Sequence, residues 1–275
     1  ANLLVTGGLD IAPVTGPDVP RLLADKSLTS FQAMSYTSYV ISMNETPGHP
    51  TTDVNVRKAI ATAIDPEAYG KAGWGNGFQL AKDVLSPQAE CYQDNSALLP
   101  KPSISSAQKV LEGAGYAKGG SGFYEKNGQP LTINVVSTTA GEGQAGEYVV
   151  QALTQLGVKV APNISDYNTF LQRGINGQFD VLTDTLPAQL PTPDFYAHVL
   201  IGNNNFNHTV DPEALDAYSQ AVTDTSCTGW NKFYQAELKN YDVIPGAYPI
   251  QYWFTRNHIQ LLPGPNLIEE QYIHK

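Results

Sequence analysis

The stretch from Tyr39 to Tyr69 limits the fold most strongly, because its apolar residues change from a strand pattern to a helix pattern. Tyr39–Asn44 is rich in β-branched and aromatic residues, which favours a strand. A break with proline and glycine follows, and Asp53 offers a helix N-cap ahead of apolar residues at helical spacing, Val56, Ala59, Ile60, Ala63 and Ile64. We expect this helix to end near Asp65, since the residue before a proline is pushed out of the helical region. The stretch predicts an α/β unit.

The rest of the chain continues this alternation. An amphipathic helix is expected over 104–116, capped by Ser103 or Ser105, and Asn127-Gly128 indicates a hairpin turn. The strand–helix–strand pattern over 131–160 suggests a parallel pair with a right-handed crossover. Further helices are expected over 166–172, 194–201, 212–222 and 230–242, and further strands over 3–6, 177–182, 248–254 and 257–262. Residues 67–103 are expected to be mainly loop.

Charge excludes some classes of partner. The formal net charge is −10, so a phosphate backbone would be repelled and nucleic-acid binding is not expected. Charged residues make up only 15% of the chain, against roughly 25% in average soluble proteins, a surface style common in exported proteins. No window approaches the ~20 apolar residues of a membrane span, and no signal peptide is visible. Because Ala1 opens what looks like a strand, we expect a piece of a longer chain.

The two cysteines, Cys91 and Cys227, both lie in stretches rich in proline, asparagine, serine and threonine that read as loops. We expect one disulfide between them in an oxidising compartment, with two unpaired thiols as the alternative. The chain contains no C-x-x-C motif, so neither zinc binding nor thiol redox chemistry has support.

Motifs for catalysis are missing. Neither G-x-S-x-G nor H-E-x-x-H occurs, and His208 lacks partners at metal-ligand spacing. Asp194 and His198 are four residues apart on an expected helix, where such a pair is typical of a surface contact. Asp180 and Asp184 alternate on one strand face, which leaves a secreted hydrolase open as a second hypothesis.

Five short sequence motifs resemble those of one protein family. A strand ending in asparagine, followed by proline and then D-x-x-V-R-x-A-I-x-x-A-I-D, resembles the signature of the family 5 extracellular solute-binding proteins, the dipeptide, oligopeptide and nickel receptors of ABC importers. Four further markers occur in the family's order, at Gly7–Ala12, Ala107–Tyr116, Phe170–Val181 and Tyr248–Tyr252. The resemblance covers nearly the whole chain, and only the family's first half is missing.

The resemblance implies a fold and a function. The fold would be α/β, a type II periplasmic-binding-protein-like lobe with a mixed sheet flanked by helices. Residues 1–36 would be a remnant of the first lobe, 37–252 the second lobe, and 253–275 a return segment toward the first.

The protein would be a monomer without cofactor or catalysis that closes two lobes on a small solute and delivers it to an ABC permease. It would work outside the cytoplasm, in the periplasm or as a cell-surface lipoprotein. A peptide-capturing chaperone or a signalling receptor on the same fold stays open as a further alternative.

The resemblance also points to residues of a solute site. In the family, the strand after G-x-F-D runs into R-x-G-W-x-x-D, which lines the cleft and whose aspartate anchors a peptide's α-amino group. Alignment on Phe179-Asp180 places the corresponding residues at Thr183, Thr185, Leu186 and Gln189. All four depart from the pattern. Gln189 is neutral, so the amine anchor is lost or moved, with Asp184 and Asp194 as open substitutes; alternatively, Gln189 simply faces solvent.

Four aromatic residues complete the candidate site. Tyr167 and Trp253 occupy the places of a cleft tryptophan and a cleft tyrosine, while Tyr36 and Tyr39 flank the expected crossing between lobes. Ordinary core packing is the alternative for each. Without the amine anchor, we expect a solute other than a peptide with a free amino terminus: a blocked or modified peptide, a saccharide or another neutral molecule.

Overall fold

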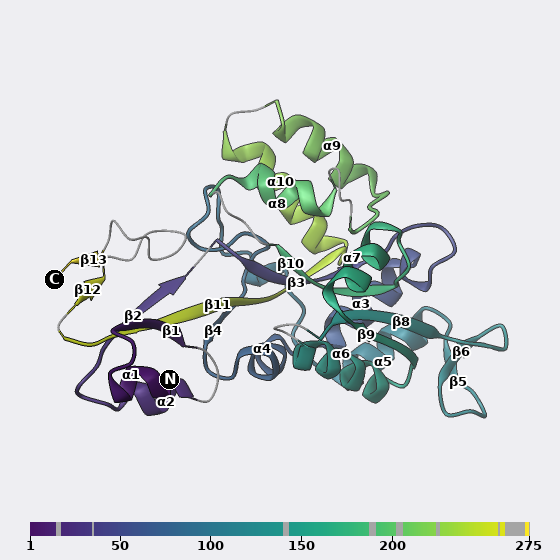
Figure 1. Ribbon diagram of the computed structural model, residues 1–275. Coiled ribbons are helices and arrows are strands. Elements are labelled where there is room, and N and C mark those ends of the chain that lie inside the picture. The colour runs from purple at the N-terminus through teal and green to yellow at the C-terminus, as the bar shows by residue number, and fades with distance from the viewer. Residues whose placement is uncertain are drawn as a thin grey trace.

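A single long strand organises the computed structural model, which describes residues 1–14, 18–34, 36–139, 143–186, 191–201, 206–223, 226–257, 259–261 and 273–274. Strand β11 (Val243–Thr255) runs through the molecule and pairs with four other strands (Figure 1). The eight-stranded sheet has the order β1-β11-β3-β10-β8-β9, and β2 and β4 also pair with β11. Its other strands are β1 (Ile11–Val14), β2 (Thr29–Met34), β3 (Ser38–Met43), β4 (Phe78–Leu80), β8 (Thr132–Thr138), β9 (Lys159–Ser165) and β10 (Val181–Leu186).

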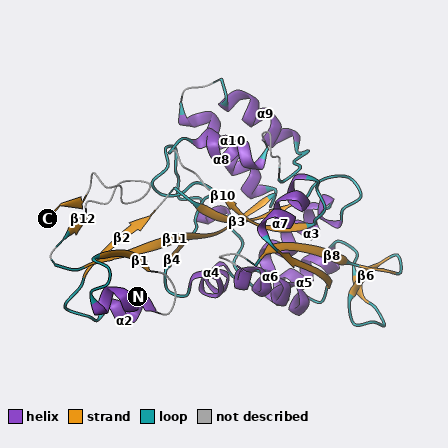
Figure 2. Ribbon diagram, in the orientation of Figure 1, coloured by secondary structure: helices purple, strands orange, loops and turns teal. Residues whose placement is uncertain are grey.

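The larger part of the sheet is mixed, with β8 parallel to β9 and β10, and β3 antiparallel to β10. Alternating side chains of these strands enter two different cores, as the two-residue period of a strand requires. Ile41 packs with helices α3 (Val54–Ala63), α4 (Pro66–Trp74), α5 (Ile104–Gly113) and α6 (Gly143–Leu156). Its neighbour Val40 packs with α7 (Tyr167–Ile175), α8 (Pro193–Leu200), α9 (Pro212–Ala221) and α10 (Cys227–Lys239). Figure 2 shows the helices on both faces, so the expected α/β fold with a flanked mixed sheet is confirmed.

A smaller part of the molecule surrounds the second half of β11. There β11 pairs with β1 and β2, next to the short helices α1 (Asn2–Thr6) and α2 (Asp18–Leu23). This part has its own apolar core, made by Leu4, Val14, Val19, Leu22, Tyr252 and Phe254. The chain's first residues and the short strands β12 (Gln260–Leu261) and β13 (Ile273–His274) lie at this same end (Figure 1).

Several predicted elements are present with their predicted caps. The side chain of Asp53 accepts a hydrogen bond at the start of α3, and that of Ser103 does so at the start of α5. Asn127 and Gly128 both have positive φ in the hairpin between β6 (Tyr124–Lys126) and β7 (Gln129–Pro130), as a type I′ turn requires. Strand β5 (Ala117–Lys118) adds to this hairpin, and Pro50–Thr52 and Ser96–Leu98 form short 3₁₀ turns.

Two expectations about these elements were wrong. Leu3–Thr6 is part of helix α1, closed by Gly7 in the left-handed region, and is not a strand. Residues 66–74 form helix α4, where a loop was expected. Helix α3 ends at Ala63, and the Asp65 side chain then caps α4, whose first residue Pro66 has a φ suited to that position. The last two predicted strands are present with other bounds, because the strand expected over 248–254 lies within β11, which begins at Val243, and the strand expected over 257–262 corresponds to β12 at Gln260–Leu261. Among the helices that the described residues form, none is long and apolar enough to cross a lipid bilayer.

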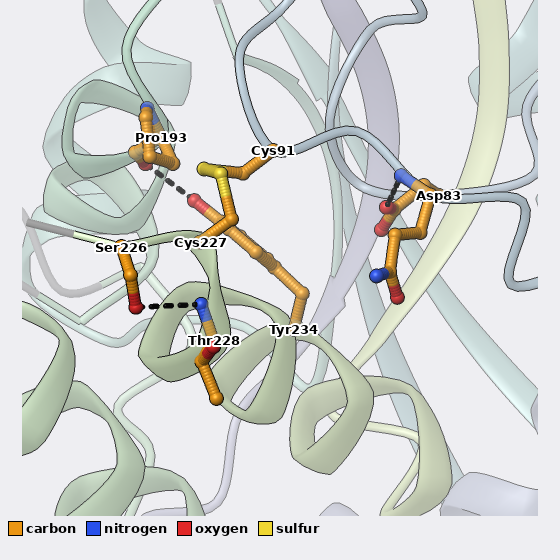
Figure 3. The surroundings of a disulfide bond; sticks show 8 residues. Asp83, Cys91, Pro193, Ser226, Cys227, Thr228 and Tyr234 are labelled. Atoms are coloured by element: carbon orange, nitrogen blue, oxygen red, sulfur yellow. Dashed lines mark hydrogen bonds between the residues drawn. A yellow bond between two sulfur atoms is a disulfide. The ribbon is translucent and has the colours of Figure 1, made fainter.

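The expected disulfide is present between Cys91 and Cys227, whose Cα atoms are 5.1 Å apart (Figure 3). Cys227 was expected in a loop, but it is the first residue of α10, because the Ser226 hydroxyl accepts a hydrogen bond from the Thr228 N–H and caps the helix there. The disulfide thus ties a turn near residue 90 to the start of α10. From the same helix, the Tyr234 hydroxyl donates to the Pro193 carbonyl (Figure 3).

A buried group of charged residues joins α3, α10 and the start of β11. The Arg57 guanidinium lies 3.1 Å from an Asp242 carboxylate oxygen and also donates to the carbonyls of Thr51 and Asn240. Glu237 is fully buried and accepts a 2.6 Å hydrogen bond from the Asn207 amide, while its other oxygen has no hydrogen-bond partner among the described residues. Burial raises the pKa of Glu237 from 4.5 to about 8, and burial also raises the pKa of Asp242.

We predict that replacing both cysteines, as Cys91→Ser with Cys227→Ser, lowers the free energy of unfolding by about 2–4 kcal/mol, because the disulfide closes a long loop. The two cysteines are 136 residues apart in sequence. Urea denaturation of oxidised protein measures the effect. Reductant should bring the unsubstituted protein to the stability of the double variant and leave the variant unchanged; a reductant with no effect on either would contradict the prediction.

We predict that Glu237 makes the protein less stable as the pH rises from about 4.5 to about 8. In that window the Glu237 carboxyl group has released its proton in the unfolded chain and still holds it in the folded protein. The free energy of unfolding therefore falls by about 1.4 kcal/mol per pH unit. Glu237→Gln should flatten this part of the curve, because its amide needs no proton. The measurement is urea denaturation across the window, with exposed Glu147→Gln as the control. Parallel curves for both variants would refute it.

Candidate functional site

One edge of the sheet brings together the ends of four strands. The parallel strands β8, β9 and β10 all end there, and antiparallel β3 begins there, since Thr138 pairs with Ser165 and Leu186 with Ser38. In α/β sheets, ligands bind outside the carboxyl ends of the parallel strands, where loops and helix starts supply polar groups. This edge is therefore the candidate binding surface.

Tyr167 stands at this edge as the first residue of α7. Its side chain is 56% exposed, and its ring stacks on Phe170 at a centroid distance of 6.2 Å. The helix start beneath it is capped by Asp166, whose carboxylate accepts hydrogen bonds from the Asn168 and Thr169 N–H groups. The Thr169 hydroxyl also donates to this carboxylate, and these bonds lower the pKa of Asp166. Tyr167 is thus an aromatic surface held on a fixed helix end.

Tyr39 lies near the same edge. It pairs with Thr185 across β3 and β10, and its half-buried ring lies 4.3 Å from that of Trp74, between centroids. Thr185 and Leu186 are placed by their backbone register in β10, close to the start of β3. Gln189 lies outside the described residues. The edge thus groups Tyr39 with Thr185 and Leu186.

Two predicted site residues are buried. Thr183 is fully buried, and its hydroxyl donates a 2.7 Å hydrogen bond to that of Ser137. Tyr36 is 6% exposed and packs in the core that contains α8, while its carbonyl accepts a hydrogen bond from the Tyr196 hydroxyl. Both side chains therefore lie inside the protein in this conformation and are not exposed at the candidate edge.

Trp253 lies on the second half of β11, in the smaller part of the molecule. Its backbone pairs with Phe31 and Pro13, and its indole N–H donates to the Gln251 side chain at 3.0 Å. Tyr39 pairs with Ala247, so Trp253 is roughly 20 Å further along the strand, at the usual rise of about 3.3 Å per residue. The predicted residues thus divide between the sheet edge and the smaller part.

The opposite end of β10 holds a contact that sequence reasoning did not predict. Asp180 accepts a 2.6 Å hydrogen bond from the Asn134 N–H on one oxygen, and its other oxygen lies 2.7 Å from Nδ1 of His49. Nothing in the local sequence links His49 to Asp180, because the pairing depends on how β3 and β10 meet. Both carboxylate oxygens of Asp180 are therefore engaged in internal contacts.

A hollow of about 520 Å³ lies beside the disulfide, and it too was not predicted. The start of α8, the facing sides of α9 and α10, and the turn that carries Glu90 line it. The Glu90 N–H donates a 2.7 Å hydrogen bond to the Pro191 carbonyl, so the hollow adjoins the chain that follows β10. Asp194 and His198, predicted as a surface pair, both line this hollow. Over the described ranges, no group of three or more histidine, cysteine, aspartate or glutamate side chains is placed to hold a metal ion.

Comparison with solved structures shows the same fold. A dipeptide-binding protein from Pseudoalteromonas sp. SM9913, in complex with Met-Leu, is 18% identical with a TM-score of 0.78, over 100% of this chain and 55% of that one. A putative peptide-binding protein AppA from Clostridium difficile is 13% identical with a TM-score of 0.84, over 99% and 58%. NikZ from Campylobacter jejuni, in complex with Ni(L-His), is 18% identical with a TM-score of 0.76, over 98% and 56%. The chain thus spans little more than half the length of these proteins.

The sequence itself gives the family. No curated protein matches it. Residues 1–208, most of the chain, match the family described as "Bacterial extracellular solute-binding proteins, family 5 Middle". The chain therefore belongs to the family 5 bacterial extracellular solute-binding proteins.

Proposed function

We propose that residues 37–252 are the second lobe of a two-lobed receptor and that 1–36 and 253–275 belong to its first lobe. The separate core around Leu4 and Phe254 supports this division, because it joins the first segment to the end of β11. The length of the similar structures supports it as well, since the chain covers only 55–58% of them.

The receptor would capture a small solute between the lobes and deliver it to the membrane subunits of an ABC importer. The family match over residues 1–208 carries this proposal. The geometry agrees with it, because exposed Tyr167 and half-buried Tyr39 lie at the sheet edge while Trp253 lies in the smaller part. A solute between the two parts would contact both, which gains affinity from burial and from exclusion of water.

The family works outside the cytoplasm. Within that range we propose a periplasmic protein or a lipoprotein held at the cell surface, acting as a monomer with a peptide-like solute, a saccharide or a similar molecule. The peptide complex among the similar structures supports the first of these solutes.

Alternatives to transport have less support. The family consists of binding proteins and not of enzymes. The hydrolase hypothesis rests on Asp180 or Asp184. Both oxygens of Asp180 are held by internal contacts at the end of β10 away from the candidate edge, and the side chain of Asp184 lies outside the described part of the structure. A chaperone or signalling receptor on the same fold would bind at the same edge and would differ in its partner, so dependence of solute uptake on the permease distinguishes it.

We predict that the full-length receptor binds peptides whose amino terminus is acetylated at least as tightly as free peptides, because neutral Gln189 takes the position of the family's amine anchor. Calorimetry with free and N-acetylated tripeptides measures this, and a panel of oligosaccharides tests the second solute class. Binding of free peptides that disappears on acetylation would show that another carboxylate holds the amine. Failure to bind any member of either panel would contradict capture of these solutes altogether.

A further inference from the structure

The hollow beside the disulfide has the size of a small-ligand site. Its volume of about 520 Å³ lies within the range of roughly 300–1,000 Å³ that such sites occupy. Pro193, Asp194 and Phe195 line it at the start of α8, and both cysteines of the disulfide also line it. Figure 3 shows the two sulfur atoms close to Pro193.

The walls of the hollow are aromatic and fixed in place. Phe195, Tyr218 and Trp230 line it from three different helices. Trp230 is only 7% exposed, and the Tyr218 ring meets it edge-on at a centroid distance of 6.2 Å. Tyr218 also lies 5.7 Å from the buried Phe233 ring, between centroids. Because these rings already pack against the core, a ligand would not have to order them.

The charges around the hollow have one sign. Glu90 and Asp194 bring carboxylates from separate elements, and within the described part of the chain neither side chain has a hydrogen-bond or ion-pair partner. Among the lining residues that the structure describes, none is lysine or arginine, and His198 alone can become positive. Aromatic faces together with carboxylates are the surroundings that an organic cation prefers, through cation–π attraction and charge-assisted hydrogen bonds.

A contact of helix α8, whose start lines the hollow, leads to the candidate binding edge. The Tyr196 hydroxyl donates to the Tyr36 carbonyl, two residues before β3 begins at that edge. The start of α8 is also held in place, because the Tyr234 hydroxyl donates to the Pro193 carbonyl. A solute lying on the edge near Tyr36 can therefore extend a side group past the start of α8 into the hollow.

We propose that the hollow receives the positively charged side group, an ammonium or guanidinium, of a peptide-like solute. This inference rests on the proposed capture of a solute at the sheet edge and narrows its class. A blocked peptide with a lysine or arginine side chain fits both the neutral Gln189 and the acidic, aromatic hollow.

The test compares two blocked peptides on the full-length receptor by calorimetry. One is N-acetyl-Ala-Lys-Ala-amide, and the other carries norleucine, which keeps the carbon chain of lysine and lacks its ammonium. We expect the lysine peptide to bind about tenfold more tightly. Asp194→Asn and Glu90→Gln should each remove most of this preference. Asp216→Asn is the matched control, since Asp216 is an exposed aspartate on α9 that does not line the hollow.

The outcomes separate this inference from the function on which it rests. Equal binding of both peptides, or a lysine preference that survives in Asp194→Asn and Glu90→Gln alike, would overturn the role of the hollow and leave solute capture standing. Binding of oligosaccharides and of neither peptide would do the same. If no peptide and no saccharide binds, the proposed capture fails first. Thermal unfolding of each variant confirms that a lost preference does not come from a lost fold.

Discussion

Strand β11 holds the two parts of the molecule together, because it pairs with strands of both parts. Its first half pairs with β3 and its second half with β1 and β2, with a shift of register between Pro245 and Ala247. The residue in that shift is Gly246, where a Cβ atom would lie 2.5 Å from the Tyr69 ring and 2.9 Å from the Tyr39 carbonyl. A side chain there would force the strand away from β3 and α4. The strand can therefore shift its register against β3 at this point because residue 246 is a glycine.

The position of Tyr39 at the candidate edge depends on this close packing of β11 against β3. Tyr39 precedes the buried part of β3, and its carbonyl is one of the atoms that limits Gly246. From α8, the Tyr196 hydroxyl donates a hydrogen bond to the Tyr36 carbonyl and fixes the chain just before it enters β3. The residues proposed to face a solute thus have neighbours in sequence that pack in the core. This division explains why Tyr36 and Thr183 are buried although motif alignment or chain position selected both.

Local sequence patterns were sufficient to predict the elements that are stabilised by interactions between residues close in sequence. The cap at Asp53, the spacing of apolar residues in α3 and the Asn127-Gly128 turn all act within a few residues, and each is present. At Asp65-Pro66 two local rules compete: the proline both ends one helix and begins another, and the sequence pattern does not say which follows. Family motifs supplied the fold of the whole. The Arg57 cluster and the hollow near Glu90 join residues far apart in sequence, so no local pattern predicts them.

The contact between the smaller part's two segments also bears on the order in which the protein folds. The Arg256 guanidinium donates to the Leu4 carbonyl, a contact between residues 252 positions apart, and β1 pairs with β11. During synthesis, β1 therefore lacks this strand partner until β11 has been made. Closing so large a loop is slow compared with forming α3 or the β6–β7 hairpin, so the larger part can fold first and offer β11 as a template. Until then, Leu4 and Val14 lack their packing partners Tyr252 and Phe254, which leaves apolar surface exposed and open to aggregation.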